Sequence, residues 1–286
     1  MWLGKSVLVD AGIDWFTTTA TDRKTATLLL LKAENYLSQE ARSGCYIKPW
    51  KMAGYSGWRC GRLEYGIRDD GAIVRLSSGL AAIEWWDVFQ ITGRCSRIDL
   101  QVTLRHIDGP TIPISRLSRK IKRFYKGRKD GPTITEWRDS DGGHTLYLGK
   151  RQSDLYFRCY NKEAQSSDPK FMGCVRLELE IKNRVTLSVI ESLMSYETIH
   201  AGILGILSYF IVDRGGPPLT VSVRPTSFYE VSVRTPDALK SLAWFNNSVK
   251  PSVSVLIEMG YLKDVIENLG LQKFVRPIVL DSDNLN

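Results

Sequence analysis

The sequence predicts an α+β protein with a central, mainly antiparallel sheet, helices flanking it and a mostly helical C-terminal region. Segments of alternating polar and apolar residues flank turn sequences such as Asp69-Asp70-Gly71 and residues 139–143, which is typical of β-hairpins. Helical apolar spacing separates these segments and dominates after about residue 183. Hairpins followed by helices favour an α+β sheet over a doubly wound parallel one.

Extended and helical segments alternate in the first part of the chain. We expect strands over residues 7–18 and 97–105, several short strands within residues 46–77, and helices over residues 24–41 and 80–91. The first helix ends near Gly44, because glycine adopts the left-handed conformation that commonly closes helices. Residues 107–113 form a loop that leads into a further helix, with Pro113 in its first turn and Gly127 after its end.

The second part begins with strands and continues with helices. Strands are expected over residues 133–138, 145–149, 155–162 and 175–182, the last two joined by a polar loop, and helices over residues 185–194 and 198–212. Residues 214–218 interrupt this pattern, and another helix opens at Thr235-Pro236-Asp237. We therefore expect one domain over residues 1–215 and a mostly helical region over residues 216–286, which binds DNA or packs on the first. No repeat of fixed period is visible.

The composition describes a globular chain. Of 286 residues 43% are hydrophobic, which excludes a disordered tail or a fibrous repeat. The longest aliphatic run is Leu28 to Leu31, far below the roughly 20 residues of a membrane span, so we expect a soluble, cytoplasmic protein with no membrane partner. Five scattered cysteines without a CxxC pair favour free thiols over a disulfide framework.

The positive charge is concentrated in one segment. The chain has 39 Lys and Arg against 31 Asp and Glu, a net charge of +8, and residues 116–129 hold eight basic residues and no acidic one. The same segment carries Ile114, Leu117, Ile121 and Phe124 at helical spacing. A solvated charged helix usually mixes both signs, so this pattern favours a helix that docks by one face and binds a polyanion with the others.

Three predicted strands each carry polar side chains at every second position. The three sets are Arg97, Asp99, Gln101 and Thr103; Tyr156, Arg158, Tyr160 and Lys162; and Arg176, Glu178, Glu180 and Lys182. One such strand is an ordinary solvent face, whereas three together indicate a polar sheet face with a function. Carboxylates suit Mg²⁺ or Mn²⁺, and a tyrosine can attack phosphorus if a nearby cation or base activates its hydroxyl. The set favours metal-assisted phosphoryl transfer, with Arg158 and Lys162 supplying positive charge.

The same residues carry a family resemblance. Ser96-Arg-Ile-Asp-Leu100, residues 145–162 (TLYLGKRQSDLYFRCYNK) and Val175-Arg-Leu-Glu-Leu-Glu-Ile-Lys182 resemble, in order, the RxDL, YxGxRxSD…RxYNK and RxExE signatures of the Rep_trans replication initiation factors. These are rolling-circle initiators of plasmids, with relatives on phages and integrative elements. The resemblance covers roughly residues 5–215, and its middle motif is the most specific.

The resemblance implies a DNA nicking-closing endonuclease that starts rolling-circle replication. Tyr160 matches the nucleophile, which stays joined to the 5′ phosphate while the freed 3′ hydroxyl primes synthesis. Asp99 and Glu178 match acidic positions of a site for Mg²⁺ or Mn²⁺, with Glu180 as a helper, and Arg158 and Lys162 lie in the nucleophile motif. The expected DNA contacts are Arg116, Arg119, Lys120, Arg123, Lys126, Arg128, Lys129, Arg151 and Ser153.

The implied partners follow from the same activity. They are origin DNA, double-stranded with a single-stranded or cruciform nick site, and a host helicase and polymerase. A single nucleophile leaves strand termination short of a second one, which makes a homodimer attractive. Trp137 and Tyr147 are candidates for stacking on unpaired bases, with core packing as the alternative. Lys240 and Lys250 are candidates for origin recognition in the C-terminal region.

One departure from the family pattern and one tyrosine spacing leave alternatives open. Thr103 stands where many members carry a second acid, so a further metal ligand comes from Glu180, Gln101 or water. Tyr156 and Tyr160 are spaced as in two-tyrosine initiators, but in a strand they lie roughly 13 Å apart, which favours Tyr160 alone. A relaxase that nicks a mobile element for transfer, and a non-catalytic DNA-binding protein on a decayed initiator scaffold, both remain as alternatives. A tyrosine recombinase, which is metal-free and largely helical, fits the strand context poorly.

Overall fold

A computed structural model describes residues 6–69, 71–106, 114–140, 143–217 and 219 of the chain. The chain divides into two units, Met1–Ser232 and Val233–Asn286, and every described residue belongs to the first. The expected loop at 107–113, the helix expected to open at Thr235, and the candidates Lys240 and Lys250 lie outside the described residues.

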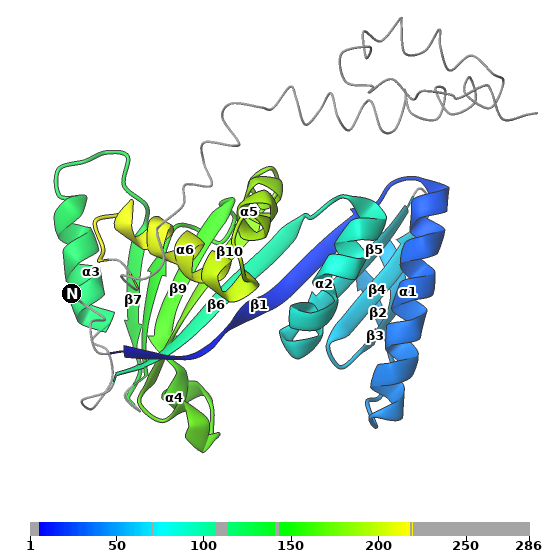
Figure 1. Cartoon of the computed structure of the whole chain (residues 1–286), viewed down its shortest axis with the longest axis horizontal. Coiled ribbons are helices and arrows are strands. Elements are labelled where there is room, and N and C mark those ends of the chain that lie inside the picture. Colours follow the sequence, from blue (N-terminus) through cyan, green and yellow to red (C-terminus); the bar gives the residue numbers. More distant parts are fainter. Residues whose placement is uncertain (1–5, 70, 107–113, 141–142, 218, 220–286) are drawn as a thin grey trace, which may run out of the picture. The chain divides into compact units, whose positions relative to one another are not determined.

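The core of the first unit is one antiparallel sheet, as the sequence predicts (Figure 1). Its strands are β1 (Ser6–Ala20), β2 (Lys48–Met52), β3 (Tyr55–Cys60), β4 (Leu63–Arg68), β5 (Gly71–Ser77), β6 (Arg97–His106), β7 (Ile134–Arg138), β8 (His144–Leu148), β9 (Leu155–Asn161) and β10 (Cys174–Lys182). They lie in the order β2-β3-β4-β5-β1-β6-β10-β9-β8-β7. The long strands β1 and β6 pair at the centre, so both halves of the sheet are built outward from them.

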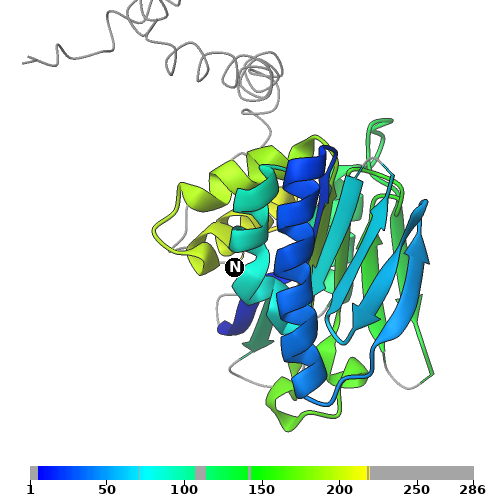
Figure 2. The same cartoon turned by 90° about the vertical axis from the view of Figure 1, so that its right-hand side faces the viewer.

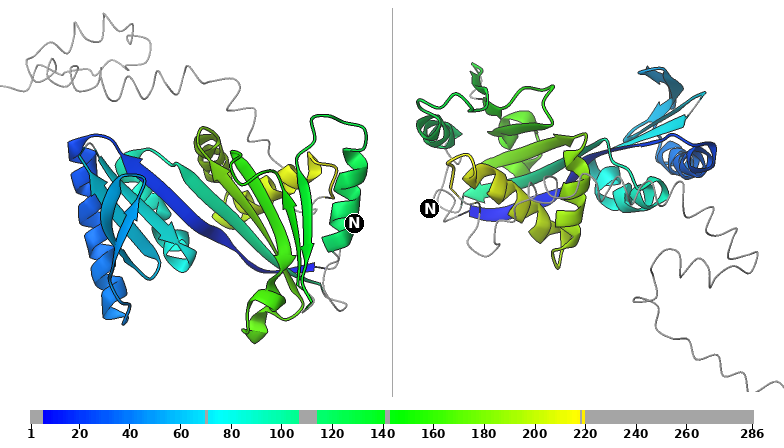
Figure 3. Two further views of the ribbon diagram at one scale, coloured as in Figure 1. Left: turned by 180° about the vertical axis from the view of Figure 1, so that it is seen from behind. Right: turned by 90° about the horizontal axis from the view of Figure 1, so that it is seen from above.

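The longer helices form a layer on one side of this sheet, and the opposite side is left open by the described residues (Figures 2 and 3). They are α1 (Arg23–Arg42), α2 (Ser78–Thr92), α3 (Ile114–Phe124), α5 (Val185–Met194) and α6 (Ile199–Val212). None of the described helices is long and apolar enough to cross a membrane. The sequence predicts only a polar loop between β9 and β10. The structure has two short helical elements there, α4 (Lys162–Gln165) and a 3₁₀ turn, Pro169–Phe171.

Alternation along the strands decides which sheet face meets the helices. Ile98, Leu100 and Val102 are fully buried on β6, and Leu177 and Leu179 match them on β10. Aromatic contacts tie the layers together, with Phe16 of β1 against Trp85 of α2 and Phe157 of β9 against Phe210 of α6. Burying each such side chain contributes about 1.5–3 kcal/mol, so this face holds the sheet to the helices. All five cysteines are free thiols, as expected.

The two halves of the sheet have the same topology. β1-α1-β2-β3-β4-β5-α2 is a long strand, a helix and a four-stranded meander that returns to the long strand, and β6-α3-β7-β8-β9-β10-α5 repeats that order. The pairing agrees in detail, because Arg75 of β5 faces Thr17 of β1 as Arg176 of β10 faces Thr103 of β6. The insertion of α4 and the 3₁₀ turn into the second half changes the spacing, which is why no fixed-period repeat is visible in the sequence.

The basic helix α3 packs on the β7–β8 end of the sheet. Its stripe of Ile114, Leu117 and Ile121 is buried, as the sequence predicts. Glu136 of β7 fixes its polar side: Lys122 Nζ donates to Glu136 Oε1 at 2.8 Å, and the Ser118 hydroxyl donates to the same oxygen. Burial acts to raise the pKa of Glu136, but the contacts from Lys122 and Ser118 outweigh it and lower the pKa to about 2. Lys122 therefore helps to hold α3 on the sheet, whereas Arg116, Arg119, Lys120 and Arg123 of the same helix are exposed to solvent.

Replacing Glu136 with glutamine should lower the free energy of unfolding at pH 7 by about 1 kcal/mol, since the carboxylate loses its partners on α3. A depressed folded-state pKa stabilises the fold above the ordinary value of 4.5, and this contribution is lost as the pH falls toward about 2. Urea denaturation of Glu136→Gln and the parent should therefore converge in acid. Glu34→Gln, an exposed acid on α1, is the control. A difference that stays constant from pH 7 to pH 2 would contradict this role.

Candidate active site

The open face of the second half-sheet carries the polar side chains that the sequence singles out, and strand register arranges them in rows. Asp99, Glu180 and Tyr156 are partners across β6, β10 and β9. The next row joins Gln101, Glu178, Arg158 and Tyr147, and the third joins Thr103, Arg176, Tyr160 and Thr145. The three strands are neighbours, so one polar face results from three separate sequence motifs.

A polar hollow of about 320 Å³ opens on the second and third rows. Its lining residues are Asp14, Ser78, Thr145, Tyr147, Arg158, Tyr160, Lys162, Gln165, Arg176 and Glu178. The hollow brings together five of the residues predicted from sequence, namely Tyr147, Arg158, Tyr160, Lys162 and Glu178. It also adds Arg176 and Asp14, which the predicted site does not contain.

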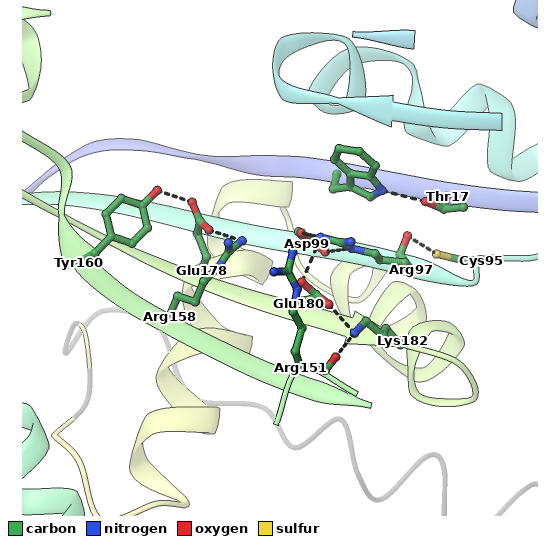
Figure 4. Close-up of polar contacts among 11 residues, drawn as sticks. Thr17, Cys95, Arg97, Asp99, Arg151, Arg158, Tyr160, Glu178, Glu180 and Lys182 are labelled. Atoms are coloured by element: carbon green, nitrogen blue, oxygen red, sulfur yellow. Dashed lines mark hydrogen bonds and ion pairs between the residues drawn. The ribbon is translucent and has the colours of Figure 1, made fainter. Parts of the chain in front are cut away.

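Tyr160 is held by one short hydrogen bond. Its hydroxyl donates to Glu178 Oε1 at 2.5 Å, and the other oxygen of Glu178 lies 2.6 Å from Arg158 Nη2 (Figure 4). Burial and the negative charge of Glu178 raise the pKa of Tyr160, so the phenol is protonated in this arrangement. Lys162 lies over the Tyr160 ring, with Nζ 5.9 Å from the ring centre. The hydroxyl thus faces a carboxylate that can accept its proton and lies among basic groups.

Asp99 and Glu180 belong to a different cluster, two rows away from Tyr160 (Figure 4). Arg97 makes two hydrogen bonds to Asp99, of 2.8 and 2.6 Å, and its Nη2 lies 3.0 Å from Glu180 Oε2. Lys182 Nζ lies 2.5 Å from Glu180 Oε1. Burial raises the pKa of Asp99 to about 6, against the opposing effect of Arg97. Neither acid lines the hollow.

Thr103, at the position where many family members carry an acid, takes part in a third set of contacts. Its hydroxyl accepts a hydrogen bond from Arg176 Nε at 2.9 Å. Asp10 of β1, the register partner of Thr103, lies 3.6 Å from Arg176 Nη2 and accepts a hydrogen bond from Gln101. A carboxylate therefore reaches this position from the neighbouring strand rather than from β6 itself.

Asp14 is the functional candidate that the sequence interpretation missed. The β1–β6 register shifts between Ile13 and Trp15, so a bulge at Asp14 breaks the alternation of the strand. Its carboxylate lines the hollow opposite Glu178, and burial followed by repulsion from Glu178 raises its pKa. The sequence signal was an acid in an otherwise apolar and hydroxylated strand segment, but simple alternation could not place it on the polar face.

The remaining predicted residues lie elsewhere. Arg116, Arg119, Lys120 and Arg123 line a separate hollow of about 350 Å³ on α3, in the helix layer. Arg151 and Ser153 are exposed in the turn between β8 and β9, where Lys182 Nζ donates to the Arg151 carbonyl. Lys126, Arg128 and Lys129 follow the exposed end of α3. The structure therefore separates the basic helix from the hollow at Tyr160.

Comparison with known proteins assigns the family. A sequence model described as Rep_trans, replication initiation factor, matches residues 115–269, more than half of the chain. The chain belongs to the replication initiation factor family. The solved structure of a rolling-circle replication initiator protein from Geobacillus stearothermophilus is similar over 78% of this chain and 94% of that chain, with 17% identity and a TM-score of 0.43. No curated protein sequence matches.

The acids of this initiation factor set limits on a metal site. Across the described part of the chain, no three His, Cys, Asp or Glu side chains are grouped so as to hold a metal ion. Two carboxylates, Asp14 and Glu178, do face the same hollow, and carboxylate oxygens are the donors that Mg²⁺ and Mn²⁺ prefer. Asp99 and Glu180 are already neutralised by Arg97 and Lys182. Glu178 is also engaged, by Arg158 and by the Tyr160 hydroxyl, so a cation in the hollow would share Glu178 with these groups.

Replacing Arg97 with methionine should lower the free energy of unfolding of this initiation factor by about 3 kcal/mol, because Asp99 and Glu180 stay buried without their shared cation. The exposed Arg94→Met is the matched control, with an expected change below about 0.5 kcal/mol. Urea denaturation at pH 7 measures both. Equal midpoints for Arg97→Met and the parent would show that the cluster contributes little to the fold.

Proposed function

We propose that this replication initiation factor starts rolling-circle replication by nicking one DNA strand, with Tyr160 as the nucleophile. The observation that carries the proposal is the Tyr160 hydroxyl in a polar hollow, hydrogen-bonded to Glu178 and surrounded by Arg158, Lys162 and Arg176. An attacking hydroxyl, a proton acceptor and a set of phosphate-binding cations are the groups that transesterification of a phosphodiester needs. Family membership supports the initiator role.

The reaction is an exchange of ester bonds. The Tyr160 oxygen forms a bond to phosphorus, the bond from phosphorus to the 3′ oxygen breaks, and the tyrosine proton passes to the Glu178 carboxylate. The 3′ oxygen leaves and takes a proton from solvent, which gives the hydroxyl that primes synthesis. Arg158, Lys162 and Arg176 stabilise the charge on the phosphate oxygens, and because Arg158 and Arg176 each also contact an acid or a hydroxyl, their positions are fixed beforehand.

A divalent cation, Mg²⁺ or Mn²⁺, belongs to the proposal. Asp14 and Glu178 are the residues that would hold it, and Asp99 and Glu180, which the family resemblance implies, keep them in position through the neighbouring row. Such a cation supplies positive charge to the scissile phosphate and to the attacking oxygen.

The DNA partner is an origin duplex with an unpaired nick site. The cations of α3 lie in the helix layer, so we assign them to duplex phosphates and the hollow to the unpaired strand. We further propose that the protein works with a host helicase and polymerase, acts as a homodimer and is located in the cytoplasm. Its C-terminal region, from residue 216, is proposed to be a separate region.

Tyr160→Phe should abolish the covalent protein–DNA adduct and the nicking of supercoiled origin DNA in Mg²⁺ or Mn²⁺, because the attacking oxygen is gone. The matched control is Tyr156→Phe, four residues earlier on the same face of β9, which should nick at nearly the parental rate. Denaturing gels that resolve the adduct measure both. An adduct formed by Tyr160→Phe would remove Tyr160 from the reaction.

Asp14→Asn should weaken Mn²⁺ binding, followed by electron paramagnetic resonance, by about tenfold or more, and slow nicking in proportion. Asp99→Asn separates the two ligand assignments, because Asp99 does not line the hollow and the variant should bind Mn²⁺ like the parent. The reverse result, with binding lost in Asp99→Asn and kept in Asp14→Asn, would favour the ligand set implied by the family resemblance.

Neutralising Lys120, Arg123 and Lys126 to alanine should reduce the slope of log affinity for duplex origin DNA against log salt by about 3, since each lost phosphate contact removes about 0.9. The control removes the same charge from exposed Arg23, Lys24 and Lys51, far along the sheet in the first half. Fluorescence anisotropy across a salt series measures both. An unchanged slope in the α3 variant would exclude this helix from the interface.

A further inference from the structure

Trp137 is an exposed tryptophan beside the candidate active site. It lies on β7, at the edge of the sheet, and 63% of its surface is exposed. Its register partner on β8 is Thr145, which lines the hollow and is itself the partner of Tyr160. Trp137 and Tyr160 therefore share one row and one face, two strand spacings or about 10 Å apart.

The alternative explanation, core packing, does not apply to Trp137. The neighbouring β7 residues Ile134 and Glu136 point to the helix layer, where Glu136 meets α3. By register with Thr145 and Tyr160, Trp137 points to the opposite face, away from the layer of longer helices (Figure 3). A large aromatic ring in contact with solvent, next to a site proposed to bind unpaired DNA, is the group that single-strand-binding proteins use for stacking.

A second aromatic platform connects Trp137 to the hollow. Tyr147 lines the hollow and stacks on Tyr156, with ring centres 5.8 Å apart and an angle of 13° between the rings. The cations Arg158, Lys162 and Arg176 lie on the same face and outnumber the hollow's two acids, Asp14 and Glu178. Stacking rings beside excess positive charge are complementary to a single strand, whose bases are free and whose phosphates are negative.

We propose that the open face of β7 and β8 is a binding subsite for single-stranded DNA, in which Trp137 stacks on an unpaired base close to the scissile phosphate and Tyr147 supports the nucleotide nearer Tyr160. The proposal rests on the proposed nicking function, because that function places the scissile phosphate at Tyr160. It assigns the unpaired strand to this edge of the sheet and leaves the duplex to other surfaces.

Trp137→Ala tests the subsite by fluorescence anisotropy with a labelled single-stranded oligonucleotide that spans the nick site. Loss of one stacking contact should weaken binding about tenfold, within the range of 5- to 150-fold that such contacts provide. Trp137→Phe should restore most of the affinity. Trp58→Ala is the matched control, since Trp58 is 46% exposed on β3 and its register partner Tyr65 packs in the helix-side core. Binding of a fully paired duplex should be the same in all variants.

An abasic nucleotide moved stepwise along the oligonucleotide identifies the stacked base. At one position close to the nick it should weaken binding to the parent about tenfold and leave binding to Trp137→Ala unchanged, because the variant has no stack to lose. Three results would overturn the proposal: unchanged single-strand affinity in Trp137→Ala, an equal loss for duplex, or an equal loss in Trp58→Ala. Adduct formation by the parent is scored separately, so a failure of Tyr160 to nick is distinguishable from a failure of Trp137 to stack.

Discussion

Charge neutralisation within the sheet is the constraint on which the rest of the site depends. Asp99, Glu178 and Glu180 are each at most 5% exposed, although they belong to the sheet face opposite the longer helices. Buried carboxylates are tolerated only when cations and hydrogen bonds compensate for lost hydration. Arg97 does this by pairing with Asp99 and Glu180, and Arg158 does it by pairing with Glu178. The long basic side chains therefore serve as the cover of this face.

This arrangement separates two tasks within one sheet. In the cluster of Arg97, Lys182, Asp99 and Glu180, two cations match two acids and hold β6 and β10 together. The rows beside it contain Tyr160 and Asp14, whose pKa values are raised by burial and by Glu178. The Tyr160 phenol donates to Glu178, and the carboxylates of Glu178 and Asp14 line the same hollow, so a phosphate and a cation would both find partners there. The neutralised cluster fixes the geometry of the strands. A charged ligand gains the most binding free energy at the neighbouring rows, where the charges are not fully neutralised.

Much of this was predictable from sequence where local pattern decides the structure. The alternation in residues 97–105 and 175–182 predicts β6 and β10 and their polar face, and the apolar stripe of α3 predicts its docking on the core. Asp14 was not predictable, because a bulge moves it to the polar face and a bulge depends on the register with a strand 85 residues away. The grouping of Glu178 with Tyr160, and of Glu180 with Arg97, likewise depends on register that no local pattern encodes.

The repeated topology explains why only one half of the sheet carries the chemistry. In the first half, Glu64 of β4 is the register partner of Arg75. In the second half, Tyr160 is the register partner of Arg176, so Glu64 and Tyr160 occupy corresponding positions. In the first half that acid forms a 2.7 Å ion pair with its arginine, and the arginine in turn stacks on Trp15. Glu64 and Arg75 therefore neutralise each other and contribute to the fold. In the second half a tyrosine takes the place of that acid, and Arg176 meets the more distant carboxylate of Asp10, at 3.6 Å. Arg176 is therefore held less closely than Arg75, and the same framework yields structure on one side and a candidate active site on the other.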